Sequence, residues 1–135
     1  MSTRKNTVHV TPQNKPKGIK DRRNILPIED IEERITYDPI AGSFSYARDC
    51  KAGALGEDAI WRFKRTDNAG TPYESTTQWE LVKYDDDHWY EPKRLAWYFI
   101  NREWPPIGMW VSAAGKYDYR AGRLELREDG DVPPR

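Results

Sequence analysis

Few side chains in this 135-residue sequence have the chemistry of a catalyst or a metal ligand. The chain holds 2 histidines and 1 cysteine, and Cys50 has no histidine near it in the sequence, so a loop or half-buried thiol is the favoured interpretation. Residues 85–88, Asp-Asp-Asp-His, could offer several ligand atoms to a hard cation. Consecutive side chains rarely point at one ion, however, so a solvated turn is favoured there. We therefore expect no catalytic residue, no metal site and no cofactor.

A second group of residues combines aromatic rings with positive charge. Lys93, Arg94 and Arg102 are interleaved with aromatic residues, as in proteins that stack the bases of single-stranded nucleic acids. The aromatic residues are Trp89, Tyr90, Trp97, Tyr98, Phe99 and Trp104. A core role is the favoured alternative for these rings, because they recur at the spacing of structural elements. Three arginines between residues 120 and 127 could hold phosphates or form a solvated face.

The longest informative motif follows Lys93, where residues 94–115 read RLAWYFINREWPPIGMWVSAAG. This run resembles the stretch that leads into the metal site of small phage-type HNH homing endonucleases. Upstream, residues 35–46 read ITYDPIAGSFSY and resemble the opening motif of the same family, and residues 51–53 match its Lys-Ala-Gly. Together the three pieces cover about residues 28–128. Their order and spacing argue against a chance match.

The residues that the resemblance would require for catalysis are absent. At the spacing where the family carries Asp-His, this chain has Val111 and Ser112, and the second His or Asn of the signature is missing after Gly115. A serine hydroxyl without an activating partner is no base at neutral pH, and valine has no lone pair for a metal ion. The resemblance therefore implies a degenerate member that lacks the catalytic His and Asn, and whether it is an enzyme stays open, with the balance against it.

Composition and charge divide the chain into three parts. Residues 1–25 carry seven Lys or Arg against one Asp, a balance of +6, and predict a disordered basic arm. Residues 26–128 are long enough for a single domain, for which 6 Trp, 8 Tyr and 3 Phe supply a core, and the resemblance implies that this domain is HNH-endonuclease-like. Residues 26–60 have a net charge of −5, and residues 129–135 predict a flexible tail.

No run is apolar enough to span a bilayer and no secretory signal is visible, so we expect no membrane contact and a location in the host cytoplasm.

The predicted fold class is α+β: a small β-meander with short helices and a degenerate ββα, HNH-like C-terminal region. Ile28, Ile31 and Ile35 recur at helical spacing, whereas Phe44 and Tyr46 alternate with serines as in a strand. The expected helices cover residues 28–36 and 92–101, and the expected strands cover residues 43–46, 60–65, 76–84, 109–112 and 117–119, with turns at 67–70 and 114–116.

Three functions are compatible with these patterns. The first is a phage-encoded, non-catalytic pseudo-HNH protein that binds and inhibits a host enzyme or defence complex. The protein-binding residues would be Trp110, Arg120 and Arg123, because Trp and Arg dominate interface energies. For Trp110 the alternative is a core residue that packs on the final helix. The second is a DNA-binding protein that tolerates many sequences and does not cut. Its nucleic-acid-binding residues would be Lys15, Lys17, Lys20, Arg22, Arg23, Lys93, Arg94 and Arg127. The third is an HNH endonuclease with an altered active site.

Overall fold

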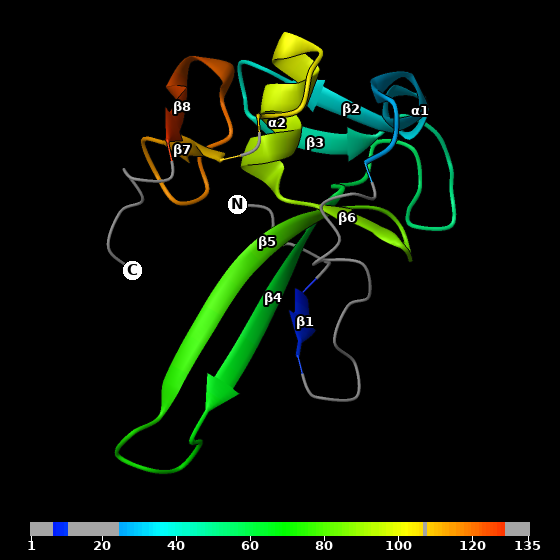
Figure 1. The fold of residues 1–135 in the computed structure, drawn as a ribbon. Helices are drawn as coiled ribbons and strands as arrows, with labels where there is room; N and C mark the ends of the chain where they lie inside the picture. Colours follow the sequence, from blue (N-terminus) through cyan, green and yellow to red (C-terminus); the bar gives the residue numbers. More distant parts are fainter. Residues whose placement is uncertain (1–6, 11–24, 107, 129–135) are drawn as a thin grey trace.

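The computed structural model describes residues 7–10, 25–106 and 108–128 (Figure 1). Among them the strands far outnumber the helices, which confirms the α+β class. The elements, in chain order, are β1 (Thr7–His9), α1 (Ile28–Arg34), β2 (Ile35–Asp38), β3 (Ser43–Tyr46), β4 (Ile60–Asp67), β5 (Ser75–Asp85), β6 (His88–Tyr90), α2 (Pro92–Asn101), β7 (Met109–Ala113), the 3₁₀ helix η1 (Ala121–Arg123) and β8 (Leu124–Glu128).

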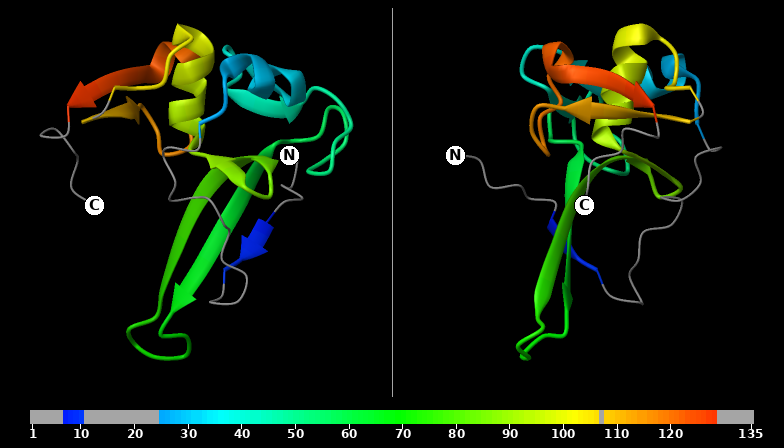
Figure 2. Two further views of the ribbon diagram at one scale, coloured as in Figure 1. Left: turned by 45° about the vertical axis from the view of Figure 1, so that its right-hand side comes forward. Right: turned by 60° about the vertical axis from the view of Figure 1, so that its left-hand side comes forward.

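Strands β1, β4, β5 and β6 form a four-stranded sheet in the order β1-β4-β5-β6, and β2-β3 and β7-β8 form two antiparallel pairs. Helix α2 lies between these two pairs, while the outer halves of β4 and β5 extend away from them as a two-stranded ribbon (Figures 1 and 2). The ribbon turns through residues 68–74, where Asn68 and Gly70 have φ of 55° and 80°. Strand β1 adds to β4 in parallel, with Val8 opposite Phe63. The sequence did not predict β1 or the short strand β6.

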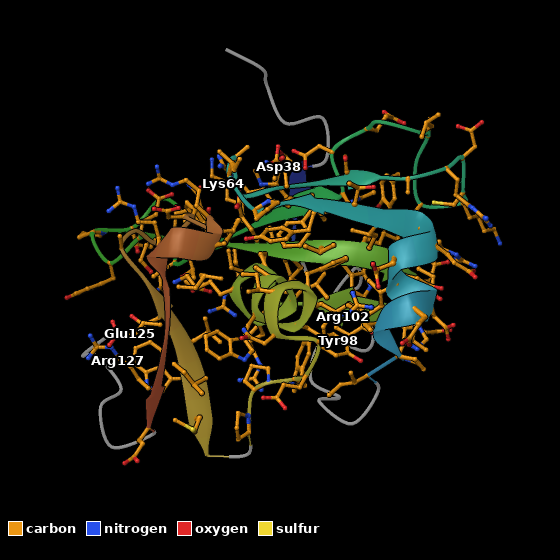
Figure 3. The ribbon with its side chains drawn as sticks, turned by 90° about the horizontal axis from the view of Figure 1, so that it is seen from above. Asp38, Lys64, Tyr98, Arg102, Glu125 and Arg127 are labelled. Carbon is orange, nitrogen blue, oxygen red and sulfur yellow. The ribbon has the colours of Figure 1, made fainter. Side chains whose placement is uncertain are left out.

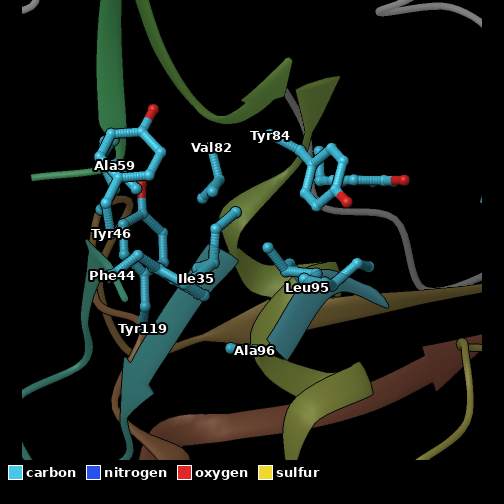
Figure 4. Packing of buried hydrophobic residues seen from close by; sticks show 12 residues of the cluster. Ile35, Phe44, Tyr46, Ala59, Val82, Tyr84, Leu95, Ala96 and Tyr119 are labelled. Atoms are coloured by element: carbon cyan, nitrogen blue, oxygen red, sulfur yellow. The ribbon is translucent and has the colours of Figure 1, made fainter. Parts of the chain in front are cut away.

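The main core lies where α1, α2 and the inner ends of the strands meet (Figure 4). Ile31, Ile35, Phe44 and Leu95 are all at most 1% exposed. Helix α2 has the predicted bounds, beginning with Pro92 at its first turn, where a missing N–H costs nothing, and ending at Arg102 in the left-handed conformation. Leu95 and Ala96 of this helix are buried, whereas Tyr98 and Phe99 pack against the core from its margin.

The predicted helix over residues 28–36 is too long. Helix α1 ends at Arg34, because Ile35 is extended with φ of −126° and ψ of 132°. Ile35 and Thr36 instead begin β2, in which Ile35 lies opposite Tyr46 of β3. Pairing with β3 stabilises the extended conformation of Ile35 more than the helical spacing of the isoleucines favours a longer helix. The branched side chain of Ile35 also suits a strand.

The predicted return strand over residues 117–119 is wrong. Strand β7 pairs instead with β8, so that Val111 lies opposite Leu126. The intervening chain packs on the core: the Tyr119 hydroxyl donates to the buried Glu80 carboxylate at 2.7 Å, and the Ala121 N–H donates to the Pro39 carbonyl at 2.9 Å. In the described residues α2 precedes β7 and a 3₁₀ turn separates β7 from β8, so a ββα unit is not confirmed.

Candidate binding surface

The two faces of the β7-β8 pair differ in burial. Val111 is 5% exposed, and Leu124 packs against the main core, so alternate residues of both strands point inward. The alternation places Trp110 and Ser112 of β7, with Glu125 and Arg127 of β8, on the outward face. We call these four residues the β7-β8 outer face. Figure 3 labels Glu125 and Arg127 at the margin of the molecule.

Trp110 is the largest side chain on the β7-β8 outer face. It is half-buried, and its indole Nε1–H donates to the Glu128 carbonyl at 3.0 Å, which fixes the ring along β8. Arg127 lies directly opposite Trp110 in the ladder, and its Nη2 is 3.5 Å from the Glu125 Oε2. A Trp beside an Arg on a fixed strand has the composition of a protein-binding hot spot.

The start of β7 is held from helix α2. The Arg94 Nη1 donates to the Met109 carbonyl at 3.5 Å, and the Arg94 guanidinium lies 5.3 Å from the centre of the Trp104 ring. The Met109 N–H donates to the Pro106 carbonyl at 3.1 Å. The Arg94 side chain is only 12% exposed, so its placement favours a structural role over a phosphate contact.

Residues 114–123 join β7 to β8 and carry the other predicted protein-binding residues. Arg120 clamps Asp118 through two hydrogen bonds of 2.9 and 2.7 Å, which lower the pKa of Asp118 to about 2. Arg123 adds to this lowering from η1. Burial lowers the pKa of Lys93 on α2, and the positive charge of Lys116 contributes. Arg120 therefore pairs directly with Asp118, while Arg123 and Lys93 interact with its charge at longer range.

The connection over residues 114–123 is held to the β4-β5 ribbon by hydrogen bonds, one of them to a buried carboxylate. The Glu80 side chain is fully buried, and it accepts hydrogen bonds from Tyr119 at 2.7 Å and from the Arg62 Nη2 at 3.2 Å. Tyr117 also reaches the ribbon, since its hydroxyl donates to the Gln78 carbonyl at 3.3 Å. The sequence offers no signal for Glu80, because one acidic residue in a strand gives no sign of its burial.

The two positions at which the resemblance would place a metal ligand and a base, Val111 and Ser112, lie on β7. Val111 points into the core, and Ser112 lies on the β7-β8 outer face opposite Glu125. The two histidines belong to β1 and β6 of the other sheet. Across residues 7–10, 25–106 and 108–128, no group of three or more His, Cys, Asp or Glu side chains is arranged to hold a metal ion.

The turn between β5 and β6 contains the other candidate chemistry. Its residues border an open pocket of about 480 Å³ that Cys50 also lines. The His88 Nδ1 is 2.7 Å from the Asp85 Oδ1, and the Lys83 Nζ is 3.1 Å from the Asp86 Oδ1. Burial would raise the pKa of Asp85, but the hydrogen bonds to His88 and to a backbone N–H hold it below its usual value. Acids and bases in this turn therefore pair with each other.

The structure separates some predicted residues and joins others. Trp110 and Arg127 face each other although they were assigned to different functions, while Arg120 and Arg123 lie beyond the opposite end of the β7-β8 ladder. Sequence reasoning missed Glu125 and Glu128, although the alternation LELRE over residues 124–128 is a strand pattern. Five predicted nucleic-acid-binding residues lie outside the described part of the chain: Lys15, Lys17, Lys20, Arg22 and Arg23.

No family model matches the chain, and neither does any curated protein or any solved structure. The resemblance to HNH endonucleases thus stays a prediction. None of the helices within the described ranges is long and apolar enough to cross a membrane.

Proposed function

We propose that this chain is a phage-encoded, non-catalytic protein of HNH-nuclease-like descent that binds and inhibits a host enzyme or defence complex in the host cytoplasm. The proposal takes residues 92–128 as a degenerate form of the ββα region. Its partner would bind the β7-β8 outer face, with the connection over residues 114–123 at the margin of the interface.

The observation that carries this proposal is the position of Trp110. A Trp that served only the fold would be expected on the inward face with Val111, yet Trp110 shares the outward face with Arg127. Its hydrogen bond to Glu128 fixes the ring before any partner arrives, which lowers the entropy cost of binding. Ser112 stands where the family has its base, so the same face supports no water activation.

Substitution of Trp110 tests the interface. Immobilised wild-type protein and the Trp110→Ala, Arg127→Ala and Tyr73→Ala variants would be compared for capture of proteins from bacterial lysate, and for affinity to the captured partner once purified. Tyr73 is a matched control, because it is an aromatic residue 80% exposed on the distant ribbon turn. Loss of a hot-spot side chain costs about 2 kcal/mol or more, which is roughly thirtyfold in affinity. We expect that loss for Trp110→Ala, a smaller loss for Arg127→Ala and none for Tyr73→Ala.

Two results would count against the proposal. Full capture by a Trp110→Ala variant whose melting temperature is within a few degrees of wild type would put the interface elsewhere. Nicking of supercoiled plasmid by the wild type with magnesium, manganese or zinc, lost on His88→Ala substitution, would show that the protein is catalytic.

DNA binding without cleavage is the second candidate, and charge distribution favours it. The basic arm of residues 1–25 has a balance of +6, and β1 within it pairs with β4. Next to β1, the Val10 N–H donates to the Lys64 carbonyl at 2.8 Å. In the folded part, Arg120 and Arg123 act on the charge of Asp118, and the charges of Lys116 and Asp118 both act on Lys93. Such groups neutralise phosphates without reading bases.

A further inference from the structure

We propose that β8 pairs with β8 of a second copy of this chain. The two strands would run antiparallel about a two-fold axis at Leu126, so that β7 and β8 of both copies form one four-stranded sheet. This self-association uses the edge of β8 and shares Arg127 with the host-protein contact proposed above, but it does not require a host protein.

The backbone hydrogen bonds at the two ends of the β7-β8 ladder show which backbone groups of β8 point away from β7. The Met109 N–H donates to the Pro106 carbonyl, and the Leu124 N–H donates to the Ala121 carbonyl, so neither the Met109–Glu128 pair nor the Ala113–Leu124 pair exchanges ladder hydrogen bonds. Hydrogen-bonded and non-bonded pairs alternate along an antiparallel ladder. Val111 and Leu126 are therefore also a non-bonded pair, and the N–H and C=O of Leu126 point away from β7.

No other described strand covers that edge. Strand β8 pairs with β7 alone within the described residues. Leu126 itself is half-buried, so its side chain has apolar surface left to bury against another copy. An uncovered edge strand is a ready template for pairing with another chain.

The charges on β8 select a second copy as the occupant. In an antiparallel pair centred on Leu126, Glu125 lies opposite Arg127 of the other strand, and the symmetry repeats this contact. A shift of the centre by one residue would set Glu125 against Glu125, or Arg127 against Arg127. The sequence LELRE is thus complementary to itself in one register only. The 3.5 Å contact between Arg127 and Glu125 within one chain is exposed and weak, so it exchanges for the intermolecular contacts at little cost.

At the ends of this edge the Leu124 N–H donates to the Ala121 carbonyl and the Glu128 carbonyl accepts from the Trp110 indole, so the pairing centres on Leu126. The interface is therefore small, well below the roughly 1,200 Å² of a standard stable complex. The dimer should therefore be weak and should appear only as the protein concentration rises.

Charge reversal tests the pairing by sedimentation velocity over a range of concentrations. We expect wild-type protein to shift from monomer toward dimer as it is concentrated, and both Glu125→Arg and Arg127→Glu to lose at least tenfold in dimer affinity. Mixing the two single variants in equal amounts should restore association, because their strands are then complementary. The double variant Glu125→Arg with Arg127→Glu should regain it alone. Melting curves of each variant check that the monomer is folded.

Hydrogen exchange gives an independent reading. The Leu126 amide should become protected as the wild-type concentration rises, whereas the Glu125 amide, which faces Ser112 of β7, should be protected throughout. A wild-type monomer at all concentrations, or dimers that persist equally in both single variants, would overturn the proposal. Because neither experiment involves a host protein, its failure is distinct from failure of the proposed function.

Discussion

Gly42 lies where the β2-β3 turn meets the connection between β7 and β8. It has φ of +71°, and a Cβ there would lie 2.6 Å from the Arg120 backbone nitrogen and 2.8 Å from the Tyr119 carbonyl carbon. Only glycine satisfies both the left-handed conformation and the close approach. Gly42 is therefore the residue that lets the last part of the chain close over the core.

We expect Gly42→Ala to lower the free energy of unfolding by about 2–4 kcal/mol, because conformational strain and a backbone clash add. Urea unfolding followed by circular dichroism measures the change. Gly122→Ala is the matched control, since no atom lies within 4 Å of its added Cβ and its φ is not positive. Its effect should stay within about 1 kcal/mol. Equal effects of the two substitutions would show that the connection does not need the contact at Gly42.

Gly53 shows that a motif match can identify a residue without giving the physical reason for it. The Lys-Ala-Gly resemblance marked this glycine without a reason, whereas the structure gives one: a Cβ would lie 2.5 Å from the ring of Tyr46. That ring belongs to a strand earlier in the chain, so no local pattern around Gly53 announces the contact. Burial raises the pKa of Tyr46 to about 12, consistent with the tight packing of its ring.

At the scale of elements, the β4-β5 ribbon has two halves with different roles. In the inner half, Phe63 is 1% exposed and stacks on Trp79 with ring centres 5.7 Å apart. The side chains from Asn68 to Thr77 are exposed. The ribbon beyond the Arg65–Thr77 pair should therefore contribute little to stability.

Replacement of residues 66–76 by Asn-Gly should leave the melting temperature within about 5 °C of wild type. A two-residue Asn-Gly turn matches the twist of the strands, and no buried apolar group is removed. Differential scanning calorimetry makes the comparison. Phe63→Ala, in the inner half of the same ribbon, should cost about 3–5 kcal/mol. A large loss of stability in the shortened variant would mean that the outer ribbon is part of the folding unit.

The elements that sequence reasoning found are those whose signals are local. Helix α2 was predicted with its correct bounds, because Pro92 and the spacing of Leu95 and Ala96 lie within one segment. Strand β8 was missed because its partner β7 is separated from it by residues 114–123, and a strand was expected inside that connection. The outward orientation of Trp110 could not be predicted from the sequence either, since it depends on the register between β7 and β8. Side chains whose roles come from distant pairing cannot be identified from their own neighbourhood.

At the scale of the whole molecule, a net charge of zero conceals a division between the arm and the domain. Residues 26–128 carry 14 Lys or Arg against 19 Asp or Glu, a balance of −5, whereas residues 1–25 have a balance of +6. An acidic domain repels a polyanion, so any DNA affinity should depend on the arm.

Substitution of glutamine for Lys15, Lys17, Lys20, Arg22 and Arg23 tests that dependence while leaving β1 in place. If the arm contacts phosphates, DNA affinity at low salt should fall, and the slope of log affinity against log salt should flatten by roughly 0.9 for each lost contact. Fluorescence anisotropy with a short duplex measures both. An unchanged slope would exclude these residues from phosphate contact, and domain stability measured in parallel controls for misfolding.

The exposed ribbon turn also makes the protein a convenient carrier. Residues 68–74 are held by their own short contacts, such as the 2.7 Å hydrogen bond from the Thr71 hydroxyl to the Asn68 carbonyl, and the turn stands clear of the body (Figure 2). A peptide epitope or a fluorescent label inserted between Gly70 and Thr71 would lie at the end of the ribbon, away from the β7-β8 outer face. A bound protein could then be imaged or isolated without blocking the surface proposed to bind it.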